Sequence, residues 1–280
     1  SRRRHNTYPL VNRNFSPRLL RGSTGPRMLW SVHEDSTVPF DVLRSVIDER
    51  ALSIAYQPII DLERRRIFAY EGLARSKSPA FAGPLPLFNA AVKHGLTGEL
   101  GRVLRQIAMD GCPQAPLFIN IHPSELNEKY LVQTDDALFQ HFSDVYLEIT
   151  ESVPLSHFRL CQTILREVQG RGVHLVVDDL GAGYSNLRYI VDLHPKVVKV
   201  DRGLVAGLRR DSRLFKLLNA IVRLCNDLDA KVVAEGIETV EELDAVMGAG
   251  VHYGQGYVLA RPAFPPPQAV WPAMGTEHVG

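Results

Sequence analysis

Short runs of apolar, β-branched residues alternate along the chain with longer segments whose apolar positions recur at helical spacing. The short runs are typical of buried strands, and the longer segments of amphipathic helices. The predicted strands are Ser53–Ile60, Ile67–Tyr70, Leu117–Ile121, Val145–Ile149, His174–Val177, Val197–Val200, Lys231–Ala234 and Gly256–Leu259. The predicted helices are Phe40–Leu52 (with Ser36 or Thr37 as its cap), Leu87–Met109, most of Glu125–His141, Phe158–Gln169, Asn186–Leu193, Arg209–Leu228 and one that opens with a capping box at Thr239–Glu242.

Strands that alternate with helices in this way indicate either a (β/α)8 barrel or a doubly wound sheet. Eight strands in a chain of this length favour the barrel. Only Asp61–Arg66 separates the first two strands, and a parallel crossover needs about a dozen residues or more. The pattern therefore predicts an α/β fold, a TIM-like (β/α)8 barrel whose first strand is antiparallel.

Composition narrows the class of protein. The chain has 280 residues, 45% of them apolar, which is enough for one sizeable core, and its net charge of +1 gives no indication of a nucleic-acid polymer or a membrane as partner. Three scattered Cys form no CxxC pair, which suits a reducing compartment. No apolar run approaches the roughly 18 residues of a membrane span. We expect a cytoplasmic domain without a membrane span, and, because residue 1 is Ser, a part of a longer protein.

The N-terminal segment differs from the rest in charge. Residues 1–33 contain seven Arg and no acidic residue, among Asn, Ser, Gly and Pro with little periodicity. The segment 1–35 is therefore a basic arm or linker, and residues 36–280 form the folded domain. A phosphate-contacting arm is one interpretation, and a solvated linker from an upstream domain is the favoured one.

Polar residues follow the strands where each one ends. They are Glu71, Asn120, Glu148 with Glu151, Asp178 with Asp179, Lys199 with Asp201, Glu235 with Glu238, and Gln255. In a barrel the carboxyl ends of the strands converge on one face, where active sites form. Any single carboxylate has a simpler explanation as a cap, a turn or a surface ion pair, and Asp178–Gly183 alone could be a turn before a helix.

Taken together, these residues predict a metal site. Carboxylates gathered at one end of a barrel need a compensating cation, and all-oxygen ligands favour Mg²⁺ or Mn²⁺ over Zn²⁺. More carboxylates than one octahedral ion requires indicate two ions. Two ions about 3.5–4 Å apart can activate a water and stabilise the leaving oxygen of a phosphodiester.

The same residues resemble a known family. The segments are Tyr56-Gln-Pro-Ile59, Glu71-Gly-Leu-Ala-Arg75, Asn120, Glu148-Ile-Thr-Glu151, Asp178-Asp-Leu-Gly-Ala-Gly-Tyr-Ser185, Lys199-Val-Asp201, Ala234-Glu-Gly-Ile-Glu238 and Gln255-Gly-Tyr257. Over residues 40 to 265 the chain resembles the EAL-domain cyclic di-GMP phosphodiesterases. The resemblance implies a (β/α)8-like barrel with an antiparallel first strand. It also implies a cyclic-guanylate-specific phosphodiesterase that linearises cyclic di-GMP to pGpG with two Mg²⁺ or Mn²⁺ ions, through in-line attack of a bound hydroxide.

The resemblance also implies a role for each matching residue. One ion would be held by Glu71, Asn120, Glu148 and Asp178, and a second by Asp178, Asp179 and Glu235. Catalytic roles fall to Lys199, which would orient the attacking water, to Glu235 as a base-like group, and to Glu71. Substrate contacts fall to Gln57, Leu73, Arg75, Asp201, Gln255 and Pro262. Glu151 would anchor the loop from Leu180 to Asn186, which couples metal binding to dimer contacts.

Three positions depart from the family pattern: Gly72 stands for a usual Ala, Leu180 for Phe and Asn186 for Ser. None of the implied ligands is missing, which favours an enzyme. Gly72 and Leu180 leave a second interpretation, a catalytically weak receptor that binds cyclic di-GMP and signals to an attached domain. A barrel scaffold without a nucleotide is the third. The implied partners are cyclic di-GMP, a second copy of the chain in a homodimer, and an upstream sensory or regulatory domain in a bacterial cytoplasm.

Overall fold

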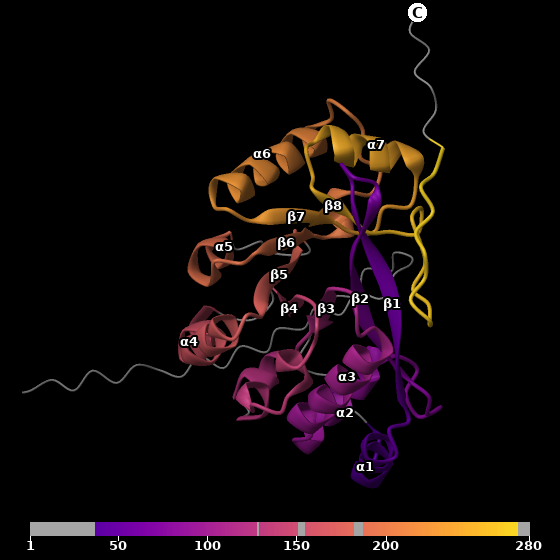
Figure 1. The fold of residues 1–280 in the computed structure, drawn as a ribbon, viewed down its shortest axis with the longest axis vertical. Helices are drawn as coiled ribbons and strands as arrows, with labels where there is room; N and C mark the ends of the chain where they lie inside the picture. The colour runs from indigo at the N-terminus through magenta and orange to yellow at the C-terminus, as the bar shows by residue number, and fades with distance from the viewer. Residues whose placement is uncertain (1–36, 128, 151–154, 182–186, 274–280) are drawn as a thin grey trace, which may run out of the picture.

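The computed structural model describes residues 37–127, 129–150, 155–181 and 187–273, and within them eight strands close into one barrel in the order β1 to β8 (Figure 1). The strands are β1 Leu52–Asp61, β2 Arg66–Ser76, β3 Leu117–Asn120, β4 Val145–Thr150, β5 His174–Leu180, β6 Val197–Val200, β7 Lys231–Ala234 and β8 Tyr253–Gly254. The predicted fold class is confirmed. The basic segment 1–35 lies outside the described residues.

Strand β1 runs antiparallel to both of its neighbours, β2 and β8, and the other adjacent pairs are parallel. The tight β1–β2 turn is held by Asp61, whose carboxylate accepts a hydrogen bond from the Arg64 amide at 2.9 Å and pairs with the Arg64 guanidinium at 2.9 Å. The prediction of an antiparallel first strand from the short link is therefore confirmed.

Helices cover the outside of the barrel, with α6 and α7 over β7 and β8 and with α2 and α3 at the opposite end of the view (Figure 1). The α-helices are α1 Phe40–Asp48, α2 Pro84–His94, α3 Thr97–Gly111, α4 Leu155–Gly170, α5 Arg188–Leu193, α6 Arg213–Asp227 and α7 Val240–Gly248. The 3₁₀ helices are η1 Pro123–Asn127, η2 Lys129–Val132, η3 Ala137–Phe139 and η4 Arg202–Leu204. None of the described helices has the length and apolar character needed to cross a membrane.

Capping residues set where several helices begin. The predicted capping box is present, since the Thr239 side chain accepts from the Glu242 amide and Glu242 accepts from the Thr239 amide. Helix α6 starts at Arg213, later than predicted, because Ser212 caps it. Helix α1 follows Pro39 without a side-chain cap, so Thr37 does not cap it, and Ser36 lies outside the described residues.

Three further predicted elements differ from the structure. The helix over Leu87–Met109 is two helices, because Gly95 adopts a left-handed conformation (φ 68°) that ends α2. Glu125–His141 forms three short 3₁₀ helices instead of an α-helix, because this segment folds around the buried guanidinium of Arg105. The last strand is Tyr253–Gly254 rather than Gly256–Leu259, which forms a turn closed by a hydrogen bond from the Leu259 amide to the Gly256 carbonyl.

A small apolar layer fills the inside of the barrel. It consists of Ile59, Ala69, Phe118, Tyr146, Val176, Val197 and Val233, with Phe68 and Tyr253 packed against it. Phe118 stacks on Tyr146 at 4.4 Å between ring centroids, and Phe68 on Tyr253 at 4.1 Å. The larger apolar core lies between the strands and the surrounding helices. The barrel interior is thus filled below the level at which the predicted site residues occur.

Candidate active site

The polar residues of the site form the next layer inside the barrel. Successive side chains of a strand point to opposite faces, so a residue two positions beyond an interior residue also points inward. The pairs are Ala69 and Glu71, Phe118 and Asn120, Tyr146 and Glu148, Val176 and Asp178, Val197 and Lys199, Val233 and Glu235, Tyr253 and Gln255, and, on the reversed β1, Ile59 and Gln57. Strand geometry alone therefore brings eight polar side chains to one end of the barrel.

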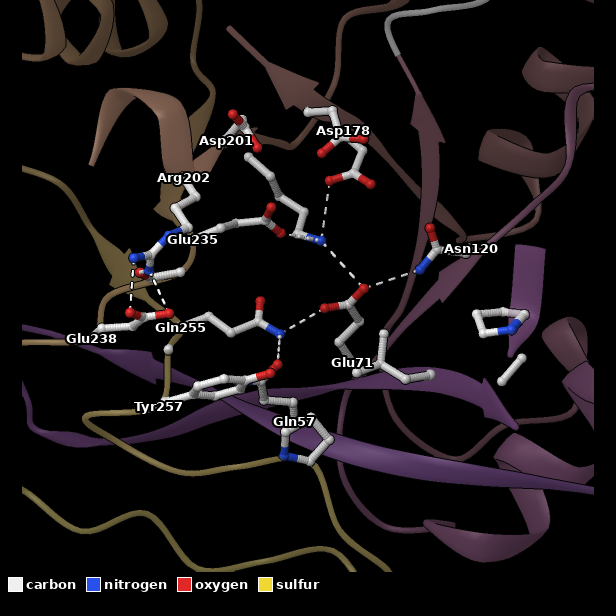
Figure 2. Close-up of a pocket in the computed structure, with 18 of the residues that line it drawn as sticks. Gln57, Glu71, Asn120, Asp178, Asp201, Arg202, Glu235, Glu238, Gln255 and Tyr257 are labelled. Carbon is white, nitrogen blue, oxygen red and sulfur yellow. Dashed lines mark hydrogen bonds and ion pairs between the residues drawn. The ribbon is translucent and has the colours of Figure 1, made fainter. Parts of the chain in front are cut away.

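Lys199 lies at the centre of this layer, with only 1% of its side chain exposed. Its Nζ lies 2.5 Å from a Glu148 oxygen and 2.6 Å from a Glu235 oxygen. It lies 3.1 Å from Asp178 and 3.5 Å from Glu71. Glu71 in β2, Asp178 in β5 and Glu235 directly after β7 extend toward one another (Figure 2). The ammonium group thus contacts four carboxylates at once.

Amide groups orient Glu71 from its other side. The Asn120 amide donates to Glu71 Oε1 at 3.0 Å, and the Gln255 amide donates to Glu71 Oε2 at 2.6 Å (Figure 2). Gln255 also donates to the Gln57 side-chain oxygen at 3.2 Å, and Gln57 in turn donates to the Ala260 carbonyl at 3.1 Å. Because Asn120 uses its nitrogen on Glu71, its oxygen remains the atom suited to a cation.

The charges of Lys199 and Glu71 support each other. Burial lowers the pKa of Lys199, but Asp178, Glu148, Glu235 and Glu71 outweigh it and raise that pKa well above its usual value. Burial raises the pKa of Glu71, but Lys199 and the two amides outweigh it, so the Glu71 pKa lies below its usual value. Lys199 is therefore charged, and Glu71 is ionised beside it.

The remaining carboxylates are not compensated by one ammonium group. Burial, reinforced by neighbouring carboxylates, raises the pKa of Glu148 and of Glu235 well above the usual value despite Lys199. Burial and the adjacent Asp178 raise the pKa of Asp179 to about 7. Glu148 Oε2 is buried without a hydrogen-bond partner among the described residues. Such a cluster needs further positive charge.

The backbone at Asp179 explains how two adjacent residues reach the same cluster. Asp179 has φ +60°, a left-handed conformation that Asp adopts more readily than most residues, and the β5–β6 register shifts between Val177 and Leu180. This kink breaks the inward–outward alternation. As a result, ligand oxygens of Asp178, Asp179 and Glu235 lie within 4.8 Å of one another.

These residues fit a divalent cation. The donor set consists of carboxylate and amide oxygens without Cys or His, which suits Mg²⁺ or Mn²⁺. The raised pKa of Asp179 and the unpartnered oxygen of Glu148 are both features that a bound cation would relieve. The arrangement can therefore hold metal ions beside a buried lysine at the bottom of an open pocket.

The pocket above the cluster collects nearly all of the predicted site residues. Those that line it are Gln57, Glu71, Leu73, Arg75, Asn120, Asp178, Asp179, Lys199, Asp201, Glu235, Gln255 and Pro262. Glu148 lies behind them and is joined to them through Lys199. Glu151 lies outside the described residues, as do residues 182–186 of the predicted metal loop.

Two of the predicted substrate residues also have structural contacts. The Asp201 side chain is 5% exposed and accepts from the Gly203 amide at 2.8 Å as the cap of η4. Arg75 donates to the Ala74 carbonyl at 2.8 Å at the edge of the pocket. Asp201 therefore shapes the loop after β6 whatever else it contacts, while Arg75 carries a guanidinium suited to an anionic ligand.

Sequence reasoning gave no role to several residues that line the pocket: Pro84, Arg202, Gly236 and Tyr257. Glu238 was among the polar residues predicted at the strand ends, but it was given no individual role. Arg202 directly follows Asp201, which already had a predicted role, and this position is the signal that could have identified it. Pro84 has no such signal, because it begins α2 far from any strand end.

The fold and the site together define a (β/α)8 barrel with a carboxylate cluster suited to cations at the carboxyl ends of its strands. The EAL domain family matches residues 41–262, and the chain belongs to this family. A Pseudomonas aeruginosa protein named cyclic di-GMP phosphodiesterase PA2567 is 30% identical over 236 residues, which cover 80% of this chain and 40% of that protein. The chain spans between 28% and 48% of the length of the curated relatives that we compared with it.

Solved structures of other proteins are similar to this chain as well. BlrP1 from Klebsiella pneumoniae, in a complex with manganese and cyclic di-GMP, superposes with a TM-score of 0.70 at 28% identity, over 80% of this chain and 59% of that one. An EAL domain protein from Listeria monocytogenes superposes with a TM-score of 0.69 at 29% identity, over 81% of this chain and 94% of that one. These similarities agree with the barrel and its family.

Proposed function

We propose that the chain is a metal-dependent phosphodiesterase that hydrolyses cyclic di-GMP to linear pGpG. The observation that carries this proposal is the set of five acidic side chains around Lys199 at the bottom of one pocket: Glu71, Glu148, Asp178, Asp179 and Glu235. The relatives named cyclic di-GMP phosphodiesterases and the neighbour solved with manganese and cyclic di-GMP support the choice of substrate.

The cluster offers ligands for two ions. Glu71, Asn120, Glu148 and Asp178 would hold one, and Asp178, Asp179 and Glu235 the other. Two divalent ions, when bound, supply the charge that activates a water and stabilises the leaving oxygen of a phosphodiester. Within this set, Glu148 Oε2 is buried without a hydrogen-bond partner among the described residues, and the Asn120 oxygen is not used in the hydrogen bond that its nitrogen donates to Glu71.

Each remaining residue would orient a reactant or move a proton. Lys199, buried among the carboxylates, would donate hydrogen bonds to the attacking water and hold it in line with the phosphorus. Glu235, 2.6 Å from Lys199, would accept the proton of that water. Gln255 would keep Glu71 in place through its 2.6 Å hydrogen bond.

The pocket rim would bind the nucleotide. Arg75 would contact a phosphate through its planar guanidinium. Gln57 and Pro262 would lie beside a guanine, and Leu73 and Asp201 would complete the contact surface. All five side chains line the same pocket as the carboxylates.

A receptor that binds cyclic di-GMP without hydrolysis is the second candidate, because a small cavity lies behind the site and is lined by Gly72, Asn120 and Ile119 among others. The cavity leaves the strand that carries Glu71 less tightly packed. Leu180 offers less support for this candidate, since it is 1% exposed and pairs with Val200 in the β5–β6 ladder.

The proposal extends to assembly and location. Helix α5 would mediate a homodimer, since its Val191 is 54% exposed and the preceding Leu187 is 45% exposed. An upstream sensory or regulatory domain would suit the greater length of the relatives. We expect the chain to act in the bacterial cytoplasm. Sedimentation at micromolar concentration tests the dimer, and a mass equal to one chain would refute it.

Metal-ligand variants test the enzyme. Glu71→Gln and Asp178→Asn should each lower turnover of cyclic di-GMP by more than the roughly 10- to 100-fold typical of residues that only support a ligand. The control is Glu241→Gln on the exposed face of α7, which should leave turnover unchanged. Full turnover by either ligand variant would refute the metal assignment. Tight nucleotide binding by a wild-type chain that makes no product would establish the receptor instead.

A further inference from the structure

An arginine–glutamate pair at the rim of the candidate active site has no part in the chemistry proposed above. Arg202 begins η4, one residue after the end of β6, and Glu238 lies between β7 and α7. Arg202 Nη1 lies 2.7 Å from Glu238 Oε1, and Nη2 donates to Glu238 Oε2 at 2.8 Å (Figure 2). Two parallel contacts of this kind fix a guanidinium in orientation as well as in position.

Arg202 also holds the backbone directly after Glu235. Its Nη1 donates to the Gly236 carbonyl at 2.6 Å. Figure 2 shows the side chains of Arg202 and Glu238 beside Glu235. Gly236 has φ +65°, and a Cβ built there would lie 2.8 Å from the Arg202 Cβ and 2.9 Å from its Cγ. The arginine therefore covers the Gly236 peptide with its aliphatic stem and binds its carbonyl with its head group.

Hydrogen bonds fix the rest of the same segment, residue by residue. They run from the Glu235 amide to the Val200 carbonyl at 3.1 Å, from the Ile237 amide to the Gln255 carbonyl at 3.1 Å, and from the Glu238 amide to Glu242 Oε2 at 2.8 Å. To these the side chain of Arg202, which lines the pocket, adds its hydrogen bond to the Gly236 carbonyl. The Gly236 carbonyl belongs to the peptide that joins Gly236 to Ile237, so fixing it restricts the two backbone dihedrals of Gly236, the residue directly after Glu235.

We propose that Arg202, oriented by Glu238, is a positioning residue for Glu235. By fixing the Gly236 carbonyl it holds the Glu235 carboxylate within reach of the aspartates of β5, and so sets the affinity of the metal site that they share. This inference rests on the proposed function, because it concerns one of the two ions assigned there. It adds two residues that act through a ligand without touching the ion or the nucleotide.

The chain provides a matched control. Arg210 and Asp244 form a second bidentate pair, with Nε at 2.7 Å from Oδ2 and Nη2 at 2.8 Å from Oδ1. This pair has the same chemistry and joins neighbouring parts of the chain, the segment between β6 and α6 and helix α7, whose start directly follows Glu238 and Thr239. Neither residue is among those that line the pocket in the described part of the chain. If Arg202 only tied these segments together, the loss of either pair would have the same effect.

The experiment is a titration of the metal-free chain with Mn²⁺, in which the electron paramagnetic resonance signal measures the free Mn²⁺. It compares wild type with R202M, E238Q and R210M. R202M should weaken one class of Mn²⁺ sites by about 10- to 100-fold, as loss of a residue that orients a metal ligand does. E238Q, which keeps an acceptor oxygen without its charge, should weaken the same class less. R210M should stay within about 2-fold of wild type, since it is remote from the ligands.

Several results would overturn the inference. The first is an Mn²⁺ affinity of R202M and E238Q equal to that of wild type. The second is a loss of Mn²⁺ affinity in R210M as large as that in R202M. The third is a raised KM for cyclic di-GMP in R202M with unchanged Mn²⁺ affinity, which would make Arg202 a substrate contact. E238Q provides the test if R202M does not fold. A wild-type chain that binds two Mn²⁺ but hydrolyses nothing would refute the proposed function alone, because the comparison of affinities would still decide the role of Arg202.

Discussion

Gly72→Ala should stabilise the protein, although glycine lies next to a proposed metal ligand. A Cβ built at Gly72 would lie 3.2 Å from Ile119 Cδ1, 3.5 Å from Ile54 Cγ2 and 3.6 Å from the Ala108 Cβ. All three atoms belong to side chains, and the same residues line the small cavity behind the site. The added methyl group would therefore enter a space that is partly empty, and only the end of Ile119 needs to shift.

The magnitude follows from three contributions. Replacing glycine within a strand reduces the entropy of the unfolded chain and contributes about 0.4–1 kcal/mol to stability. Burying one methyl group contributes about 0.8 kcal/mol. Displacing Ile119 from its preferred rotamer costs about 0.5–1.5 kcal/mol. The expected net gain is about 0.5 kcal/mol, or about 1–2 °C in Tm for a domain of this size.

Urea denaturation and thermal melts of the metal-free protein measure this gain. The control is Gly256→Ala, where a Cβ would lie 2.0 Å from the Ile237 carbonyl oxygen and 2.3 Å from its amide nitrogen. Backbone atoms cannot yield as a side chain does, so this variant should be strongly destabilised or fail to fold. If Gly72→Ala were less stable than wild type, the packing argument at this strand would be wrong.

Three further predictions concern buried ionisable groups. Glu125→Ala should cost about 3–5 kcal/mol in urea unfolding, because Arg105, only 1% exposed, would lose one of its two carboxylate partners; an unchanged midpoint would contradict the assigned ion pair. His122→Asn should reduce the loss of folding stability that acidification causes. Burial lowers the pKa of His122 to about 4, so between pH 6.5 and 4 the unfolded state binds a proton that the folded state does not. This difference lowers the free energy of unfolding of wild type by up to about 3 kcal/mol. Parallel stability–pH curves for the two proteins would refute that reasoning. Lys199→Met should lower the Tm in EDTA, because four carboxylates lose their shared cation, and Mn²⁺ should raise the Tm of the variant by more than that of wild type; equal melting in EDTA would argue against the role of Lys199 in charge compensation.

Much of the fold follows from local pattern, because strand alternation is a local property. The inward direction of Glu71, Asn120, Glu148 and Lys199 results from the two-residue period of their strands, and this period can be read from the sequence. The antiparallel first strand follows from the length of one turn. Elements decided by local physics were therefore predicted correctly, including the capping box at Thr239.

Other features depend on contacts that no local pattern reveals. The segment Glu125–His141 has apolar spacing that suits a helix, yet the buried Arg105 draws its carboxylates inward and breaks it into 3₁₀ turns. The left-handed conformation of Asp179, which turns its carboxylate toward the cluster, is equally invisible in sequence. The pairing of Arg202 with Glu238 joins residues from two different strand ends and becomes apparent only once the barrel closes.

Turnover tests the central claim most directly. The purified chain is incubated with cyclic di-GMP and Mn²⁺ or Mg²⁺, with EDTA in a parallel sample, and the products are separated by chromatography. The account predicts that linear pGpG forms with either metal and that EDTA abolishes it, because five acidic side chains around one lysine are built to hold cations beside a phosphodiester. Formation of pGpG at the same rate in EDTA, or tight binding of cyclic di-GMP without any product in the presence of metal, would contradict it.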